Sequence, residues 1–378
     1  MTVGEPRFTV GIEEEYLLVD RATRDLAVSP PPEMLNECER RLQGRVTPEF
    51  LQTQIEVGTG ICDTMDQART ELAFLRRTVA DVADAYGLAP IAASTHPFGR
   101  WRDQVHTDKD RYHALDQDMQ VTARRLLICG MHVHVALEDD ELRIDVLNQA
   151  PYFLPHLLAL STSSPFWEGT ETGLKSYRLC VFDELPRTGL PEHFASHGEY
   201  QRTVDTLIRT GLIEDASKVW WDIRPSARFP TLEMRVTDVC PLLDDTIAIA
   251  AIYRCICRML YRLRLDNQRW RIYSRFLIDE NRWRAQRYGV EEGLVDFGAG
   301  AVVPFTELLE ELVELLREDA EYFGCVKEVE HAREIIRRGT SAYRQVAAYR
   351  AVLAEGGDER QALETVVDQL IAETVTGL

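Results

Sequence analysis

The sequence predicts an α+β fold in which a small sheet is covered by helices. Several short segments alternate apolar and ionisable residues with the period of two that a strand requires. Two internal segments instead repeat apolar residues every three or four positions, which is typical of a helix. From residue 305 onward the pattern is helical almost throughout. Together these features predict strands in the first two thirds of the chain and a helical layer over residues 305–378.

The first predicted strand, residues 8–18, separates into two faces. The apolar face carries Phe8, Val10, Ile12, Tyr16 and Leu18, and the other carries Thr9, Gly11, Glu13 and Glu15. Glu14 falls on the apolar face, where a carboxylate is costly unless it is paired. We expect Glu14 either to pair with a buried cation or to mark a twist or bulge in the strand.

Two internal helices are predicted. Residues 65–86 have apolar side chains at helical spacing, and Asp63 or Thr64 is available as the N-cap. Residues 245–262 are apolar on several sides, as expected of a helix buried against a sheet. The Pro-rich residues 29–32 are interpreted as a turn.

Four further strands are predicted to pair an apolar face with an ionisable one. They span residues 54–57, 131–137, 220–224 and 231–238, with Glu56, His132 and His134, Asp222 and Arg224, and Glu233 and Arg235 on their polar faces. A half-solvated sheet also alternates in this way. Exposed strand faces favour Thr, Ser, Lys and Gln, however, whereas these carry groups that bind metals, phosphates and carboxylates. The composition therefore favours one shared cleft over a solvated face.

Composition limits the function classes. The chain has 378 residues, 45% hydrophobic and 28% charged, the balance of a globular protein. The net charge of -19 argues against nucleic acid as a partner, because phosphate binding requires a concentrated basic surface. The sequence shows no signal peptide and no apolar run of membrane-spanning length, and the eight scattered cysteines form no C-x-x-C pair. We expect a cytoplasmic protein without a membrane partner.

The glutamates of the polar faces are candidate metal ligands. Clustered carboxylates repel one another unless a cation lies between them, and Mg2+ prefers oxygen ligands while also binding phosphates. Glu13, Glu15, Glu56 and Glu233 are the candidates.

His132 and His134 leave three interpretations open. One imidazole can bind a metal while the other contacts substrate, or the pair can belong to a zinc amidohydrolase, since such enzymes use H-x-H at the end of a strand. The third interpretation is purely structural, with both rings hydrogen-bonded by neighbouring carboxylates.

Four arginines suit a clamp for phosphoryl or carboxylate groups, because guanidinium binds both with two hydrogen bonds. They are Arg178, Arg224, Arg228 and Arg235. Arg235 is the strongest candidate, since it lies two residues from Glu233 on the same predicted face. No Walker A or Rossmann glycine pattern is present, so ATP, if used, is not bound by a P-loop.

Seven ordered motifs resemble one known family. They are Gly11-Ile12-Glu13-Glu14-Glu15, Thr95-His96-Pro97-Phe98, Gly130-Met131-His132-Val133-His134-Val135, Ser163-Ser164-Pro165-Phe166, Trp221-Asp222-Ile223-Arg224-Pro225-Ser226, Glu233-Met234-Arg235 and Asn281-Arg282-Trp283-Arg284-Ala285. They are similar to the YbdK-type carboxylate-amine ligases, the second class of glutamate-cysteine ligases. The resemblance runs from about residue 7 to 290 and continues more loosely to the C-terminus.

The resemblance implies an antiparallel sheet curled into a funnel and backed by helices, related to the catalytic domain of glutamine synthetase. It implies one catalytic domain over residues 1–378. ATP would phosphorylate a carboxylate, classically that of glutamate, and an amine, classically that of cysteine, would displace the phosphate. By motif, Mg2+ would be held by Glu13, Glu15, Glu56, Glu233 and His132, with Glu49 as a weaker addition. Arg235 would neutralise the transferred phosphoryl group, Arg178 would contact substrate or phosphate, and His134, Arg224 and Arg228 are further candidates for binding substrate or ATP.

Three functional hypotheses follow. The first is an ATP- and Mg2+-dependent ligase that acts on a small-molecule carboxylate and amine, as a homodimer or larger homo-oligomer. The second is a metal-dependent amidohydrolase that uses His132 and His134. The third is a relative that binds nucleotide without turnover.

Overall fold

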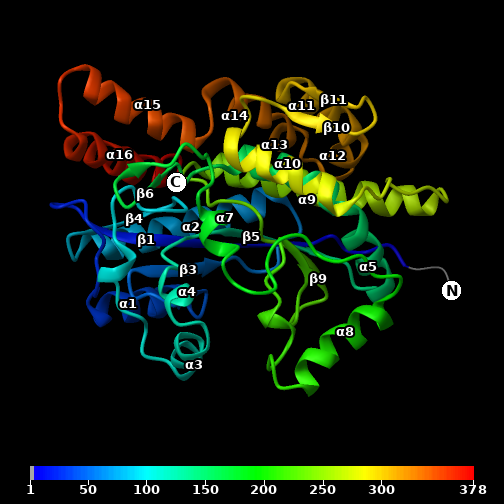
Figure 1. The fold of residues 1–378 in the computed structure, drawn as a ribbon, viewed down its shortest axis with the longest axis horizontal. Helices are drawn as coiled ribbons and strands as arrows, with labels where there is room; N and C mark the ends of the chain where they lie inside the picture. The colour runs from blue at the N-terminus through cyan, green and yellow to red at the C-terminus, as the bar shows by residue number, and fades with distance from the viewer. Residues whose placement is uncertain (1–3) are drawn as a thin grey trace.

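The computed structural model describes residues 4–378, with an antiparallel seven-stranded sheet at its centre (Figure 1). The strand order is β2-β3-β1-β5-β9-β8, and β4 pairs with β1 beside this path. The strands are β1 (Val10–Asp20), β2 (Val46–Pro48), β3 (Gln54–Gly58), β4 (Leu88–Ile91), β5 (Met131–Ala136), β8 (Ile223–Pro225) and β9 (Thr231–Met234). All their pairings are antiparallel, so the predicted antiparallel sheet is confirmed. Within residues 4–378 the outer strands β2 and β8 do not pair with each other, so the funnel curl stays a prediction.

Two small ribbons and many helices surround this sheet. The ribbons are β6 (Phe166–Trp167) with β7 (Thr170–Glu171) and β10 (Leu294–Asp296) with β11 (Ala301–Val303). The helices before residue 305 are α1 (Pro32–Leu42), α2 (Met65–Asp84), α3 (Asp110–Met119), α4 (Val121–Arg124), α5 (Asp140–Gln149), α6 (Leu154–Ser161), α7 (Arg178–Phe182), α8 (His197–Arg209), α9 (Leu243–Leu265) and α10 (Arg275–Tyr288). No helix among residues 4–378 is long and apolar enough to cross a membrane.

The helix predictions at residues 65–86 and 245–262 are confirmed as α2 and α9. Thr64 caps α2, because its side chain accepts a hydrogen bond from the backbone N–H of Gln67 at 3.2 Å. Both helices pack against the sheet, α2 on β1, β3 and β4 and α9 on β1 and β5. Their buried faces join the apolar faces of those strands in one hydrophobic core.

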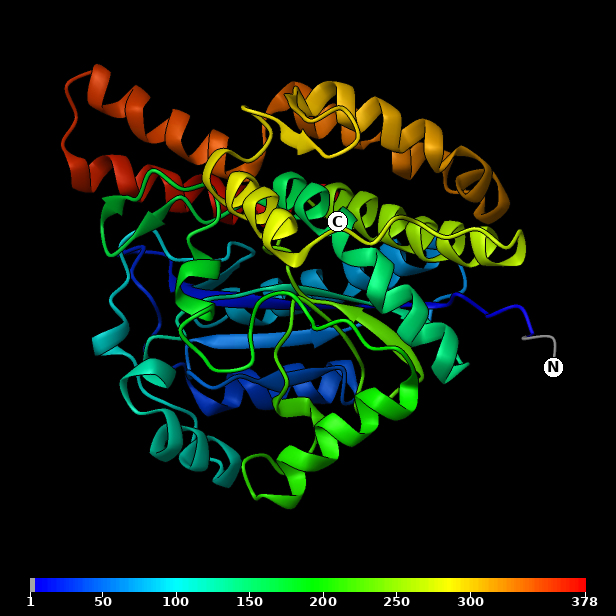
Figure 2. The ribbon, with the colours of Figure 1, turned by 45° about the vertical axis from the view of Figure 1, so that its right-hand side comes forward.

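Residues 305–378 form the helices expected of the C-terminal part. They are α11 (Phe305–Leu315), α12 (Arg317–Phe323), α13 (Val326–Glu330), α14 (Ala332–Arg338), α15 (Ser341–Ala354) and α16 (Glu359–Thr374). Both views place them on one side of the sheet, while α3 and α8 lie on the opposite side (Figure 1, Figure 2). α16 packs on β4, and the backbone N–H of Ala92 donates to the Thr374 hydroxyl at 2.9 Å.

The alternation predicted for the first strand is present in β1. Val10, Ile12 and Tyr16 are buried, whereas Glu13 and Glu15 are partly exposed on the other face. Glu14 is fully buried, as its place on the apolar face predicts. The strand begins and ends two residues later than predicted, at Val10 and Asp20.

Arg76 of α2 is the buried cation that pairs with Glu14. The Arg76 Nε and Nη2 atoms donate to the two Glu14 carboxylate oxygens at 2.8 and 2.6 Å, and both side chains are completely buried. Tyr16 and Thr246 also donate hydroxyl hydrogen bonds to Glu14, at 2.5 and 2.8 Å. The remaining Arg76 donors reach the carbonyl oxygens of Cys240 and Pro241, just before α9. Every charge of this pair is therefore hydrogen-bonded, and β1, α2 and α9 meet at it.

Two predicted strands differ from the structure. The strand expected over residues 231–238 ends at Met234, because the amides of Arg235 and Val236 both donate to the carbonyl of Asp222, at 2.7 and 3.1 Å. Two amides on one carbonyl break the regular ladder. The strand expected over residues 220–224 is β8, residues 223–225, so Asp222 precedes it. The predicted turn at residues 29–32 also gives way to α1 at Pro32, since proline suits the first helical position.

The buried ion pair predicts a large loss of stability when only its cation is removed. Arg76→Met leaves the Glu14 carboxylate buried without a counter-charge, which costs about 3–5 kcal/mol of unfolding free energy. Urea denaturation followed by circular dichroism measures the loss. Arg77→Met is the matched control, since Arg77 is the exposed neighbour on α2 and its replacement should change stability by about 0.5 kcal/mol or less. Equal losses in the two variants would contradict this role for the pair.

Candidate active site

The strand register gathers the predicted polar residues into one row across the sheet. Each residue comes from a polar strand face and lies opposite another such residue on the neighbouring strand. The cross-strand pairs are Glu15 with Glu56, Glu13 with His132, His134 with Glu233, and Glu233 with Arg224. Residues that face each other in this way have Cβ atoms about 5 Å apart, so residues distant in sequence become neighbours in one site.

Glu13 lies between the two histidines. Its carboxylate oxygens are 3.3 Å from His132 Nδ1 and 3.5 Å from His134 Nε2. Burial acts to raise the pKa of Glu13, but the hydrogen bond with His132 and the close contact with His134 outweigh burial and hold that pKa well below its ordinary value. Burial and the charge of Arg235 lower the pKa of His132, which favours the neutral imidazole that binds metals.

Glu15, Glu49 and Glu56 form a second carboxylate group beside the first. Burial, followed by the charge of Glu15, raises the pKa of Glu49 to about 7. Burial and the charges of Glu49, Glu13 and Glu15 raise the pKa of Glu56 well above its ordinary value. Thr47 donates to Glu56 at 3.1 Å, and the backbone N–H groups of Gly130 and Phe50 donate to Glu15 and Glu49 at 2.7 and 3.3 Å. These three neutral donors leave most of the mutual repulsion uncompensated, so a cation here would be bound favourably.

Three overlapping groups of side chains have the spacing of a metal site. In each group one ligand atom per residue lies within 4.8 Å of the others; the groups are Glu13, His134 and Glu233; Glu13, Glu56 and His132; and Glu15, Glu49 and Glu56. Glu13 and Glu56 each belong to two groups, so the groups are continuous. Their donors are mainly carboxylate oxygens, the ligands that Mg2+ prefers. All six predicted metal ligands, together with His134, belong to these groups.

Two arginines bind the carboxylate of Glu233 on β9. Arg224 Nε and Nη2 donate to its two oxygens at 2.9 and 3.1 Å, and Arg235 Nη1 contacts the same carboxylate. Burial acts to raise the pKa of Glu233, but Arg235 and Arg224 outweigh burial and lower it. The predicted proximity of Glu233 and Arg235 is therefore present in the structure.

Arg178, the first residue of α7, is a buried cation without a carboxylate partner among residues 4–378. Its Nη atoms donate to the carbonyl oxygens of Val236 and Arg235 at 3.3 and 3.1 Å, and its Nε has no hydrogen-bond partner. Only a glycine fits beside it, because a Cβ on Gly130 would lie 2.4 Å from Arg178 Nη2. Burial lowers the pKa of Arg178.

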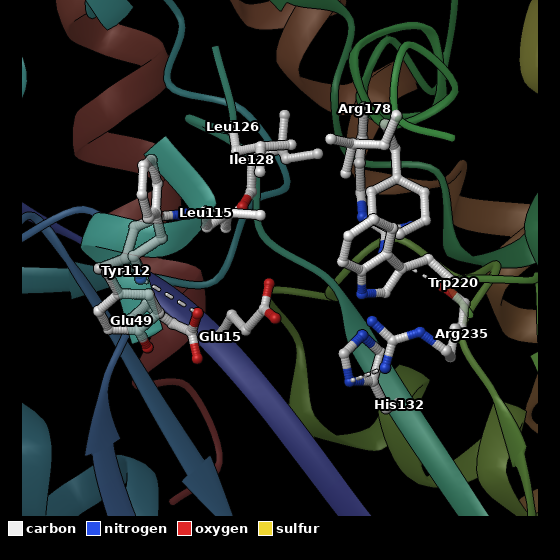
Figure 3. Close-up of a pocket in the computed structure, with 14 residues that line it drawn as sticks. Glu15, Glu49, Tyr112, Leu115, Leu126, Ile128, His132, Arg178, Trp220 and Arg235 are labelled. Atoms are coloured by element: carbon white, nitrogen blue, oxygen red, sulfur yellow. Dashed lines mark hydrogen bonds between the residues drawn. The ribbon is translucent and has the colours of Figure 1, made fainter. Parts of the chain in front are cut away.

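A cavity of about 150 Å³ is lined by members of two of the metal-ligand groups, Glu15, Glu49 and His132, and by Arg178 and Arg235. Figure 3 shows Glu15 and Glu49 on one side and Arg178, Arg235 and His132 on the other. Leu126, Ile128 and Trp220 are among the apolar side chains that close it.

Arg228 lies away from the other predicted residues. It is exposed in the loop between β8 and β9 and lines a separate hollow with residues of α8. The fold places Arg178, Arg224 and Arg235 at the metal-ligand groups and the cavity, but not Arg228, because the loop turns its backbone outward before β9 begins.

Arg282 of α10 is a residue whose role the sequence did not reveal. It donates to both oxygens of Asp183 at 2.7 and 2.9 Å and to both oxygens of Asp222 at 2.6 and 3.1 Å. Asp183 directly follows α7, which carries Arg178, and the Asp222 carbonyl holds the backbone of Arg235. One guanidinium thus ties together the segments that carry both cavity arginines. The motif at residues 281–285 was the available signal, but it did not indicate a partner.

Comparisons with known proteins agree on the family. A sequence model of glutamate-cysteine ligase family 2 matches residues 9–369. A protein of Rhodospirillum rubrum whose name proposes a glutamate-cysteine ligase 2 is 59% identical over 378 residues, covering 99% of this chain and 97% of the relative.

Two solved structures share the fold. A bifunctional glutathione synthetase from Pasteurella multocida matches with a TM-score of 0.67 at 16% identity, covering 97% of this chain and 52% of that one. A glutamate-cysteine ligase from Francisella tularensis, solved in complex with AMP, matches with a TM-score of 0.66 at 16% identity, covering 97% and 89%.

The crowded carboxylates predict a metal-dependent gain in thermal stability. Mn2+ or Mg2+ at 100 times its Kd should add about 2.7 kcal/mol to the unfolding free energy, because only the folded chain assembles the ligands. Glu56→Gln should reduce the metal-induced rise in Tm by more than half, since Glu56 belongs to two of the three groups. Without metal, the same variant should melt at or above the wild-type Tm because one repelling charge is gone. Differential scanning fluorimetry measures both effects, with exposed Glu355→Gln as control; an undiminished metal response in Glu56→Gln would contradict the assignment.

Proposed function

This chain belongs to glutamate-cysteine ligase family 2 and is a carboxylate-amine ligase, and on that premise we propose that it uses ATP and Mg2+ to activate a glutamate-type carboxylate as an acyl phosphate. An amine then displaces the phosphate, which forms a γ-glutamyl-type amide. The observation that carries the proposal is the contact between the metal-ligand groups and two arginines around one cavity.

Phosphoryl transfer depends on positioning and charge neutralisation more than on a nucleophile from the protein. The arrangement of charges suits that requirement. Mg2+, when bound, would neutralise phosphate charge and orient the phosphoryl group. The side chains that would hold Mg2+ are Glu13, Glu15, Glu49, Glu56, Glu233 and His132. Arg235 lies beside Glu233 and provides a cation for the transferred group. Arg224 keeps Glu233 ionised and oriented, and His134 is fixed by Thr231 at 2.9 Å.

The reaction balances without a covalent bond to the enzyme. A carboxylate oxygen of the acid bonds to the terminal phosphorus of ATP, and ADP leaves with the electron pair of the broken P–O bond. The amine nitrogen then bonds to the acyl carbon, and the C–O bond to phosphate breaks. One proton from the amine leaves with inorganic phosphate.

Because the chain belongs to a ligase family, the ligase hypothesis is preferred over the hypothesis of an amidohydrolase that uses His132 and His134. Both imidazoles contact Glu13, so their positions agree with a binding or structural role. A relative that binds nucleotide without turnover is separated from a working ligase by measuring ADP. The homodimer or larger homo-oligomer stays a prediction that analytical ultracentrifugation tests.

ADP release should require acid, amine, ATP and Mg2+ together. A coupled ADP assay over amino-acid pairs, followed by mass spectrometry of the amide product, measures it. Glu233→Gln and Arg235→Ala should each lower kcat by about 10²–10³-fold, the loss expected when one group that stabilises developing charge is removed. Exposed Arg77→Ala is the control and should retain wild-type turnover. Near-normal activity in either site variant with an intact circular dichroism spectrum would exclude the assigned roles.

Arg282 should act as a positioning residue. Arg282→Lys keeps a positive charge but cannot bond both Asp183 and Asp222 with paired donors, so Arg178 and Arg235 lose their common support. We expect kcat to fall about 10-fold or more while the KM for ATP changes little. Arg284→Lys is the control, because Arg284 on the same helix bonds only the carbonyl oxygens of Gly293 and Glu292. Equal kcat values for the two lysine variants would refute the positioning role.

A further inference from the structure

The cavity beside Arg178 has charged groups below and apolar groups above. Its floor is formed by Glu15 of β1, His132 of β5 and Arg235, which directly follows β9. Its cover comes from outside the sheet, from α3, the segment after α4, α7 and the segment before β8; the covering side chains include Tyr112, Leu126, Ile128, Phe182, Leu185 and Trp220. Figure 3 shows Leu126 and Ile128 between the glutamate side and the Arg178 side. A ligand in this cavity therefore contacts charged side chains on one side and apolar side chains on the other.

The negative and positive side chains that line the cavity lie on different sides of it. Glu15 and Glu49 lie on one side of the cavity and Arg178 on the other (Figure 3). Arg178 is 2% exposed, and its Nη atoms donate only to carbonyl oxygens, while Asp238 and Glu15 act on its charge from beyond hydrogen-bond distance. A buried guanidinium in this state gains strongly from an anionic ligand. A molecule that carries both a carboxylate and an amino group can direct the carboxylate towards Arg178 and the amino group towards the glutamates.

The cover of the cavity is mainly apolar, and the volume enclosed between the cover and the charged residues is known. A cavity of about 150 Å³ is the size that accommodates a benzene ring in a protein interior. Phe182, Ile128 and Leu185 are buried members of its wall. A charged side chain placed against them would lose hydration without finding a partner, whereas an aromatic or branched aliphatic group would gain from burial.

Resting on the ligase function proposed above, we propose that the amine substrate is an α-amino acid with a large apolar side chain, aromatic or branched aliphatic. Its carboxylate pairs with Arg178, its side chain fills the apolar part of the cavity, and its amino group lies on the Glu15 side. The ammonium group first loses a proton to solvent. The uncharged amino nitrogen then bonds to the acyl carbon, phosphate leaves with the electron pair of the C–O bond, and the second proton that the nitrogen loses ends on phosphate. The product is an N-acylated apolar amino acid.

Binding and turnover together test this substrate class. Isothermal titration calorimetry on the full chain measures the Kd of L-phenylalanine, L-leucine, L-cysteine and phenethylamine. ADP release with L-glutamate, ATP and Mg2+ measures kcat/KM for the same four amines. L-phenylalanine or L-leucine should bind and react at least 10-fold better than L-cysteine. Phenethylamine, which lacks the carboxylate, should bind at least 10-fold more weakly than L-phenylalanine, and equal binding would overturn the role given to Arg178.

A cavity-filling variant locates the side chain. Leu126→Trp should weaken binding of L-phenylalanine at least 10-fold, and should weaken binding of L-cysteine less, because the smaller side chain needs less of the apolar part of the cavity. Val121→Trp is the matched control, because Val121 is 53% exposed on the neighbouring α4 and its replacement should change neither value. Unchanged L-phenylalanine binding in Leu126→Trp would place the side chain elsewhere and overturn the inference.

The outcomes distinguish this inference from the proposed function. A preference for L-cysteine in both assays overturns the apolar substrate class and leaves the ATP-dependent ligase intact. Binding of L-phenylalanine or L-leucine with no ADP from any pair supports the cavity assignment and overturns the proposed ATP chemistry. Absence of both binding and ADP overturns both.

Discussion

The buried pair of Glu14 and Arg76 is the constraint on which the site depends. β1 is the strand with which β3, β4 and β5 all form hydrogen-bonded pairs. The Glu14–Arg76 ion pair fixes which face of β1 points to the core. Because side chains alternate along a strand, a shift by one residue would exchange the two faces. Glu13 and Glu15 would then enter the apolar core and Glu14 would leave Arg76 without a partner. The energetic cost of that shift holds Glu13 and Glu15, the two candidate metal ligands of this strand, on the polar face.

The strand register set by β1 also determines which carboxylates of the site have a neighbouring cation and which do not. At the β9 end, Arg224 and Arg235 compensate Glu233. At the β3 end, Glu15, Glu49 and Glu56 lack comparable cations, and burial with mutual repulsion raises the pKa of Glu49 to about 7. The two ends of the row therefore differ in charge balance, and a bound cation would stabilise the β3 end. This difference in charge is set by residues on paired strands, so it is already present in the structure without a ligand.

Local patterns in the sequence predicted the parts of the structure that depend on local geometry. The period of two along β1 placed Glu13 and Glu15 together, and the spacing of apolar residues predicted α2 and α9. The partner of Glu14 could not be predicted, since Arg76 is 62 residues away and only the packing of α2 brings it close. Glu49 was named only through family resemblance. The end of β9 at Met234 and the support from Arg282 depend on Asp222, whose backbone and side chain act on different segments. The outward position of Arg228 depends on the conformation of one loop.

The apolar cover of the cavity also lay beyond local patterns, because its side chains come from separate short segments that carry no common motif. Its position next to Arg178 has a chemical consequence. Apolar walls exclude water, and hydrogen bonds and ion pairs are stronger where water is excluded. The same walls that select a ligand's side group therefore strengthen the attraction between Arg178 and a carboxylate. They would also limit the access of water to an acyl phosphate formed on the floor, so that an amine competes against fewer water molecules for the activated carbon. In the proposed reaction, selectivity for the ligand and protection of the intermediate would thus come from one set of side chains.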